Sequence, residues 1–180
     1  PIELQTTKNI FALMFLLRGI PFVDLAYLRK ADIQGNTLRY RRRKTGRLLT
    51  VMLTPDAIKL IRIVAKTKPE SPYLFPFLSS PEGTEAAYHE YQSSLRMFNY
   101  RLSRLKKYMK TAAHLSSYTI RHTWATMAYY CEIHPGIISE AMGHSSIKVT
   151  ETYLKPFQNE KIDNANSQVI SYVKEYASIV

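Results

Sequence analysis

Residues 38–53 read LRYRRRKTGRLLTVML, and no other stretch of the chain has the same period. The stretch up to Lys44 alternates from side to side, Thr45-Gly46 supplies a two-residue turn, and residues 47–53 return as an apolar, β-branched run. This pattern predicts a β-hairpin. Residues 31–34, ahead of the Gly35-Asn36 turn signal, are expected to add a third strand.

The two faces of the first strand differ in character. Leu38 and Tyr40 share one face, which they would turn toward protein. Arg42 and Lys44 continue this face, and we expect both to lie on the inward side of the hairpin. The opposite face forms a basic edge turned to solvent or to DNA, made of Arg39, Arg41 and Arg43.

Helical spacing of apolar residues dominates the rest of the chain. We expect helices at about residues 6–17, 21–28, 54–67, 84–110, 117–130, 135–142, 146–154 and 159–176. Prolines interrupt regular structure between residues 68 and 83. The sequence therefore predicts a single α+β domain over residues 1–180, mainly helical, with a small three-stranded antiparallel sheet near the N-terminus.

The composition limits the kinds of molecule that the chain is expected to bind and the classes of protein to which it can belong. The 25 Lys and Arg against 14 Asp and Glu leave a net charge of +11, which favours nucleic acid first and an anionic membrane surface second. The single cysteine, Cys131, rules out an internal disulfide and a cysteine-rich zinc site, and it indicates a reducing compartment. The longest apolar run, residues 10–17, is too short to span a bilayer. Without the glycine spacing of a P-loop, nucleotide hydrolysis is not expected.

Two motifs contain polar side chains that could bind a phosphate or take part in catalysis. Residues 118–126 read YTIRHTWAT and place Arg121 and His122 at the start of a helix, where an arginine aimed into a cleft would fork onto two phosphate oxygens. The alternative is a surface cation beside a satisfied histidine. In the second motif, Gly143 ends one helix and Ser145 or Ser146 caps the next, which fixes His144 in a tight corner. Tyr153 follows His144 by nine positions.

Together these motifs resemble the catalytic domain of the tyrosine recombinase (phage integrase) family. The resemblance spans roughly residues 6–180 and rests on the Arg121-His122 pair, the spacing from Gly143-His144 to Tyr153, and a lysine at a hairpin turn. Two further segments, RGIPFVDLAYL at residues 18–28 and YLFPFL at residues 73–78, look like integrases of conjugative transposons and related mobile elements.

The resemblance implies a site-specific recombinase that cuts and rejoins DNA without metal, nucleotide or other cofactor. Tyr153 would attack the scissile phosphate and form a 3′-phosphotyrosyl link. Arg121 would neutralise the phosphate, Lys44 would protonate the leaving 5′-oxygen, and His144 would hydrogen-bond the phosphate or assist proton transfer.

The chain departs from the family pattern at two positions. The family usually has histidine three residues before the second arginine, where this chain has Tyr118, which can still donate a hydrogen bond. The family's first arginine aligns with Pro21. Arg42, on the inward face of the hairpin, is the predicted replacement, and Arg18, three residues before Pro21, is the rival.

The resemblance also implies partners. Double-stranded DNA is the expected substrate, with Arg41, Arg43 and Lys148 contacting it, and the active form is expected to be a homotetramer on DNA. Family members similarly pass C-terminal segments between protomers, so we expect residues 159–180 to dock in trans. We further expect an N-terminal core-binding domain to be missing from this chain, accessory DNA-bending proteins to assist, and action in the bacterial cytoplasm at the nucleoid.

A non-catalytic reading stays open. Residues 135–154 contain a helix, a glycine turn and a second helix, as a helix-turn-helix repressor would. A repressor, however, has no use for Tyr153 together with two cationic clusters outside its reading helix. A third class, an RNA-binding module, accounts for the charge and for none of the spacings.

Overall fold

A computed structural model describes residues 2–109, 114–152 and 159–177. Its helices are α1 (Ile2–Leu16), α2 (Phe22–Ala26), the 3₁₀ turn η1 (Lys30–Asp32), α3 (Pro55–Val64), α4 (Glu85–Met109), α5 (Thr119–Tyr130), α6 (Pro135–Met142), α7 (Ile147–Glu151) and α8 (Asn159–Ala177). Its strands are β1 (Ile33–Gln34), β2 (Thr37–Arg41) and β3 (Leu48–Met52). The mainly helical fold with one small sheet is confirmed.

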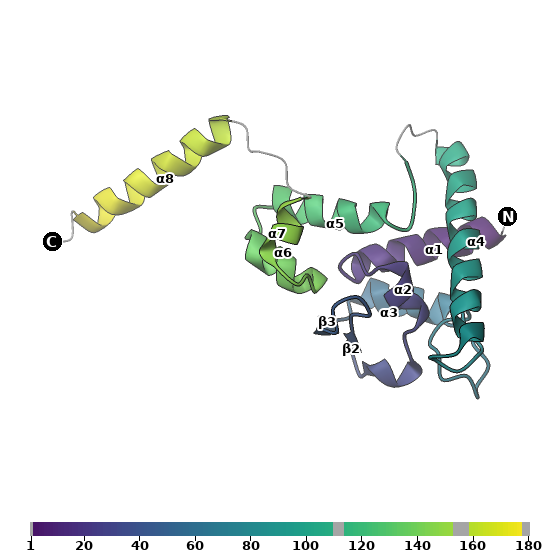
Figure 1. The fold of residues 1–180 in the computed structure, drawn as a ribbon. Coiled ribbons are helices and arrows are strands. Elements are labelled where there is room, and N and C mark those ends of the chain that lie inside the picture. Colours follow the sequence, from purple (N-terminus) through teal and green to yellow (C-terminus); the bar gives the residue numbers. More distant parts are fainter. Residues whose placement is uncertain (1, 110–113, 153–158, 178–180) are drawn as a thin grey trace.

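Helix α1 is the centre of the larger core (Figure 1). It contacts α3, α4 and α5, and it buries Leu13 and Met14 completely. The helix begins before the predicted residue 6, because the hydroxyls of Thr6 and Thr7 donate to carbonyls four residues earlier instead of capping a helix start.

The sheet has the order β1-β2-β3 and is antiparallel throughout, with Leu38 opposite Val51. Leu38 and Tyr40 are buried as the alternation predicted, and Arg42 continues their face inward. The expectation for Lys44 was wrong, since its side chain is exposed. The reason is that β2 ends at Arg41, and the backbone N–H of Arg42 donates to the carbonyl of Arg47, so that a four-residue turn replaces the predicted two-residue one.

The proline-rich segment between α3 and α4 is part of the core. Its backbone pairs with the chain after α2: Lys30 N–H donates to the Pro72 carbonyl over 2.9 Å, and Leu74 N–H donates to the Leu28 carbonyl over 2.8 Å. Tyr73 and Phe75 are buried between these contacts. This loop is therefore held in a fixed position, although its prolines interrupt regular structure.

Helix α8 projects away from the other helices (Figure 1). The side chains described over residues 159–175 are all exposed, including apolar ones such as Ile162 and Val173. One ion pair, from Lys161 to Glu132 over 3.2 Å, links the start of α8 to the end of α5. No helix within the described ranges has the length and apolarity to cross a membrane.

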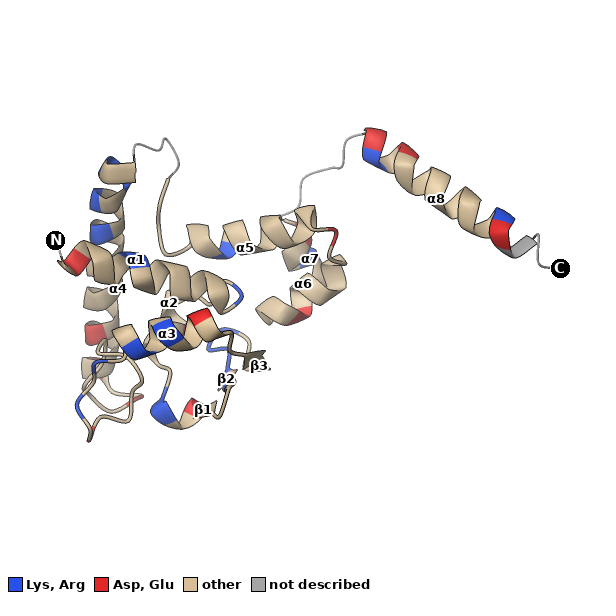
Figure 2. Ribbon diagram, turned by 180° about the vertical axis from the view of Figure 1, so that it is seen from behind, with Lys and Arg blue, Asp and Glu red and all other residues tan. Residues whose placement is uncertain are grey.

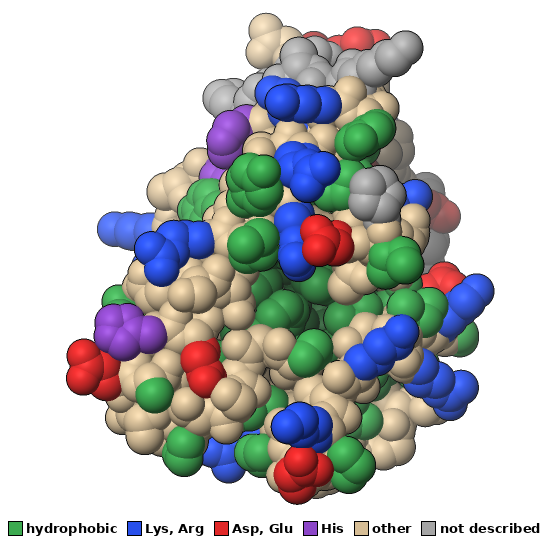
Figure 3. Space-filling model, turned by 90° about the vertical axis from the view of Figure 1, so that its right-hand side faces the viewer, with side chains coloured by type: hydrophobic (Ala, Val, Ile, Leu, Met, Phe, Trp, Pro, Cys, Tyr) green, Lys and Arg blue, Asp and Glu red, His purple; other side chains and the backbone are tan. Residues whose placement is uncertain are grey.

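Positive charge gathers on α4. Its lysines and arginines run from the middle of the helix to its C-terminal end, as Figure 2 shows from behind, and they are Arg96, Arg101, Arg104, Lys106 and Lys107. In Figure 3 the face that includes α4 shows lysine and arginine side chains with hydrophobic side chains between them.

Candidate active site

Arg121 lies near the start of α5 and is only 5% exposed. Its guanidinium donates through Nη1 to the Gly19 carbonyl over 3.1 Å, and through Nη2 to the Met142 carbonyl over 2.7 Å. These two carbonyls come from the turn after α1 and from the end of α6. Arg121 is therefore held between two elements that are distant in sequence, which fixes the direction of its fork.

The turn between α6 and α7 gives three successive carbonyls to side chains. After Met142, the Gly143 carbonyl accepts from the Thr45 hydroxyl over 3.1 Å, and the His144 carbonyl accepts from Arg47. Both donors belong to the β2–β3 hairpin. The turn that carries Lys44 and the turn that carries His144 are therefore joined directly.

His144 is 4% exposed, and its Nδ1 shares a hydrogen bond of 2.8 Å with the Thr150 hydroxyl on α7. Burial lowers the pKa of His144 to about 4, helped by the positive charges of Arg121, Arg42 and Lys44. The imidazole is therefore neutral at pH 7. The positive charges of these three side chains therefore act on His144.

Arg42 is 5% exposed and forms a buried ion pair with Asp24 of α2. The second oxygen of Asp24 accepts from the backbone N–H of Arg43 over 2.9 Å. Gly143 makes room for the Arg42 side chain, because an added Cβ at Gly143 would lie 2.8 Å from Arg42 Cγ. Among the buried side-chain atoms of the described residues, Nε of Arg42 and Nε of Arg101 are those without a hydrogen-bond partner. An unsatisfied buried donor calls for an explanation, and a ligand oxygen is one.

Arg18 approaches the same region from the turn after α1. Its backbone has φ +60°, a left-handed conformation that is rare for a residue with a side chain. Burial and the charge of Asp24 raise the pKa of Tyr40, and the cations that oppose this rise are Arg42, Arg121 and Arg18. The charges of both rivals for the first-arginine role therefore act on Tyr40.

The remaining predicted catalytic residues differ in position. Lys44 is exposed at the tip of the hairpin, beside the two residues that bind the α6–α7 turn. Tyr118 precedes α5, is 57% exposed and meets His122 edge to face, whereas Arg121 one turn later is buried. Tyr153 lies outside the described residues, two positions after the end of α7.

The three predicted DNA contacts are all exposed, but they are not equivalent. Arg41 donates to the Gly46 carbonyl over 3.1 Å, across its own turn. Arg43 pairs with Glu82 and lies over the Tyr27 ring, 3.8 Å from its centroid. Lys148 is on α7. Arg43 is therefore already engaged by protein groups, which its place on the basic edge did not reveal.

Sequence reasoning missed Asp24, Thr150 and Arg47 as parts of the site. A signal existed for Asp24, because it is the one acid in a short apolar helix, and a buried carboxylate needs a cation. No comparable signal marks Thr150 or Arg47, since their partners are fixed by the fold. Within the described ranges, no cluster of three or more His, Cys, Asp or Glu side chains is arranged to hold a metal ion.

Solved structures resemble this chain at low sequence identity. The Tn1549 transposon integrase in complex with transposon right end DNA has a TM-score of 0.66 at 14% identity, covering 92% of this chain and 59% of that one. XerA recombinase has a TM-score of 0.59 at 16% identity, covering 91% and 63%. A lambda integrase dimer bound to a core site has a TM-score of 0.56 at 14% identity, covering 85% and 56%.

These matches show a shared fold, and the chain spans about three fifths of the length of these relatives. No curated protein matches the chain. The phage integrase family profile, in contrast, matches residues 4–160, from α1 to the start of α8. That range is most of the chain and contains the hairpin, Arg121, His144 and Tyr153, and the chain therefore belongs to the phage integrase family.

Proposed function

We propose that the chain is the catalytic part of a site-specific DNA recombinase, which breaks and rejoins strands through a 3′-phosphotyrosyl intermediate. The observation that carries this is that Arg121, Arg42 and the hairpin turn next to Lys44 all contact residues 142–143, beside the buried His144. Such a cluster of preorganised cations suits the charge that develops on a phosphate under attack. The DNA complexes of the Tn1549 and lambda integrases support DNA as substrate.

Each group has a role in a balanced reaction. The Tyr153 oxygen bonds to phosphorus, the bond from phosphorus to the 5′-oxygen breaks, and Lys44 gives that oxygen a proton. The proton of Tyr153 passes to water, and His144, which is neutral at pH 7, hydrogen-bonds the phosphate or assists this transfer without holding the proton. The link conserves the bond energy, so a 5′-hydroxyl of another strand rejoins by the reverse steps.

Arg121 and Arg42 would bind the non-bridging oxygens of the phosphate. Arg42 takes this role in place of the arginine that the family has at Pro21, held in direction by Asp24. Tyr153, the proposed nucleophile, follows Thr150 by three residues in the sequence, and Thr150 binds His144.

The helix-turn-helix alternative is disfavoured by the α6–α7 turn. Its three carbonyls bind Arg121, Thr45 and Arg47, so the turn is committed to the protein interior and to the hairpin. A repressor presents the residues near this turn to the groove instead. The described part of α7 is five residues long, which is short for a recognition helix.

The test is covalent capture. The chain is incubated with nicked duplexes of randomised sequence, and adducts that resist denaturant are isolated and sequenced. We expect adducts with the unmodified protein and none with Tyr153→Phe, whose DNA affinity should be unchanged because the basic surface remains. Adducts from Tyr153→Phe would assign another nucleophile, and no adduct from the unmodified protein would support the repressor reading.

We further propose that residues 159–180 dock on a neighbouring protomer in a tetramer on DNA. The support is the exposed apolar face of α8, which includes Val169, Ile170 and Tyr172. Truncation after Gln158 should leave monomer folding intact and prevent assembly on DNA, measured by analytical ultracentrifugation with duplex. Normal assembly of the truncated chain would contradict trans docking.

A further inference from the structure

Lys44 depends on its neighbours for its position. Its ammonium has no hydrogen-bond partner among the described residues, and it lies in a four-residue turn outside the strands. On one side, Thr45 binds the Gly143 carbonyl over 3.1 Å. On the other side, Arg43 is tied in the opposite direction, toward α2 and the proline-rich segment. The backbone of Lys44 is thus held between two anchors.

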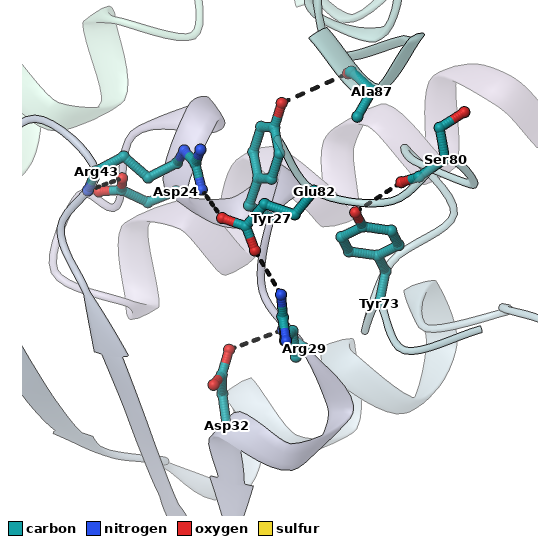
Figure 4. Close-up of polar contacts among 9 residues, drawn as sticks. All are labelled: Asp24, Tyr27, Arg29, Asp32, Arg43, Tyr73, Ser80, Glu82 and Ala87. Carbon is teal, nitrogen blue, oxygen red and sulfur yellow. Dashed lines mark hydrogen bonds and ion pairs between the residues drawn. The ribbon is translucent and has the colours of Figure 1, made fainter. Parts of the chain in front are cut away.

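The second anchor is a cluster around Glu82 (Figure 4). One oxygen of Glu82 accepts from Arg43, and the other accepts from Arg29 over 2.6 Å. The Arg43 guanidinium also stacks on Tyr27, and its backbone N–H binds Asp24. The cluster lines a cavity of about 490 Å³, whose wall also includes Tyr40 and Arg42. Hydrogen bonding by Arg43 lowers the pKa of Glu82, so the carboxylate is charged at neutral pH.

Glu82 is itself fixed, although it lies in a loop. The Tyr73 hydroxyl donates to the Ser80 carbonyl over 2.8 Å, two residues before Glu82. Glu90 of α4 accepts from the backbone and hydroxyl groups of Ser79 and Ser80. An isolated pair at 33% exposure would contribute little, but a carboxylate shared by two arginines on a fixed loop acts as a network.

We propose that Glu82 is a positioning residue for strand cleavage, which holds Arg43 and thereby places the Lys44 ammonium at the leaving 5′-oxygen. This inference rests on the proposed function, in which Lys44 is the acid. Glu82 does not touch the DNA in this scheme. Its loss therefore affects the step that needs the proton and leaves phosphate binding by Arg121 and Arg42 in place.

A substrate that needs no acid separates this role from a structural one. In a nicked duplex whose scissile 5′-oxygen is replaced by sulfur, the phosphorus–sulfur bond breaks to release a thiolate. A thiolate leaves without protonation, because thiols are far more acidic than alcohols, with a pKa of about 8.5 for cysteine. The sequence used is the one recovered by covalent capture, and rates are measured at saturating DNA.

Glu82→Gln should slow cleavage of the oxygen substrate about tenfold, a part of the 10²- to 10⁴-fold that a general acid contributes. Its rate on the sulfur substrate should stay within about twofold of the unmodified protein, which also shows that the variant is folded. Glu70→Gln is the matched control, because Glu70 is exposed outside the cluster and its loss should change neither rate.

Lys44→Ala separates the two proposals. If sulfur does not restore cleavage by Lys44→Ala, then Lys44 is not the acid, and the proposed function is wrong at that residue. If sulfur restores Lys44→Ala while Glu82→Gln cleaves both substrates like the unmodified protein, the positioning role is wrong and the proposed function stands. Equal slowing of both substrates by Glu82→Gln would also overturn the inference.

Discussion

At the scale of a single residue, Arg42 has two roles: it pairs with Asp24, and in the proposed mechanism it binds phosphate. Arg42→Ala would leave a buried carboxylate unpaired, at a cost of about 3–5 kcal/mol, so Arg42→Lys is the cleaner variant. The lysine keeps the positive charge but lacks the two parallel N–H donors of the guanidinium. We therefore expect adduct formation to slow roughly 10²-fold, as for loss of one oxyanion donor. Arg41→Lys is the matched control on the basic edge, measured in the same adduct assay. Normal cleavage by Arg42→Lys, with loss of cleavage in Arg18→Ala, would give the role to Arg18.

His144 makes stability depend on pH. Its pKa is about 4 in the folded chain and about 6.5 in an unfolded one, so the unfolded state binds the extra proton between these values. Stability is therefore fully present above pH 6.5 and falls as the pH drops toward 4. Thermal melts at pH 6.5 and 5.0 should show this loss, and His144→Asn should reduce it. His89→Asn, at an exposed position, should keep the full loss, and an unchanged slope in His144→Asn would contradict the assignment.

At the scale of elements, the close fit between the α6–α7 turn and the hairpin depends on Gly143. Its φ is +65°, and an added Cβ would meet Arg42 Cγ at 2.8 Å and Leu49 Cδ1 at 3.1 Å. Gly143→Ala therefore adds a clash to the backbone strain, and we expect about 2–3 kcal/mol of destabilisation in chemical denaturation. Gly35→Ala isolates the strain alone, because Gly35 has φ +59° with nothing within 4 Å, and it should cost about 1 kcal/mol. If the two substitutions destabilised the protein equally, the hairpin would have shifted to accommodate the added methyl group at Gly143.

The elements themselves were largely predictable, whereas their ends and their long-range pairs were not. Helix α6 matches its predicted residues 135–142, because Pro135 and Gly143 mark both ends locally. The pairing of Arg43 with Glu82 joins residues 39 positions apart and follows from the fold of the proline-rich segment, which no local period encodes. Strand alternation predicted that the Arg42 side chain is buried. It could not predict that the Lys44 side chain is exposed, because the alternation ends where the strand ends.

For the whole molecule, the net charge of +11 predicts how DNA binding responds to salt. If roughly six to ten phosphates are contacted, affinity should fall about 10³- to 10⁵-fold between about 50 and 200 mM salt. Fluorescence anisotropy with duplexes of two unrelated sequences should give similar slopes, since backbone contacts dominate. Removal of one α4 contact, as in Arg104→Gln, should lower the slope by about one unit. A flat response would contradict binding through the DNA backbone.

The buried guanidinium of Arg42 keeps one donor open, and this donor bears on which buffer ions the protein binds. Asp24 pairs with Nη1 of Arg42, but Nε has no hydrogen-bond partner among the described residues. A small tetrahedral anion would supply the missing acceptor oxygen at this position. Sulfate and phosphate buffers should protect the chain against heat, and in the same concentration range they should compete with DNA, so the conditions that preserve the protein best are those that slow it.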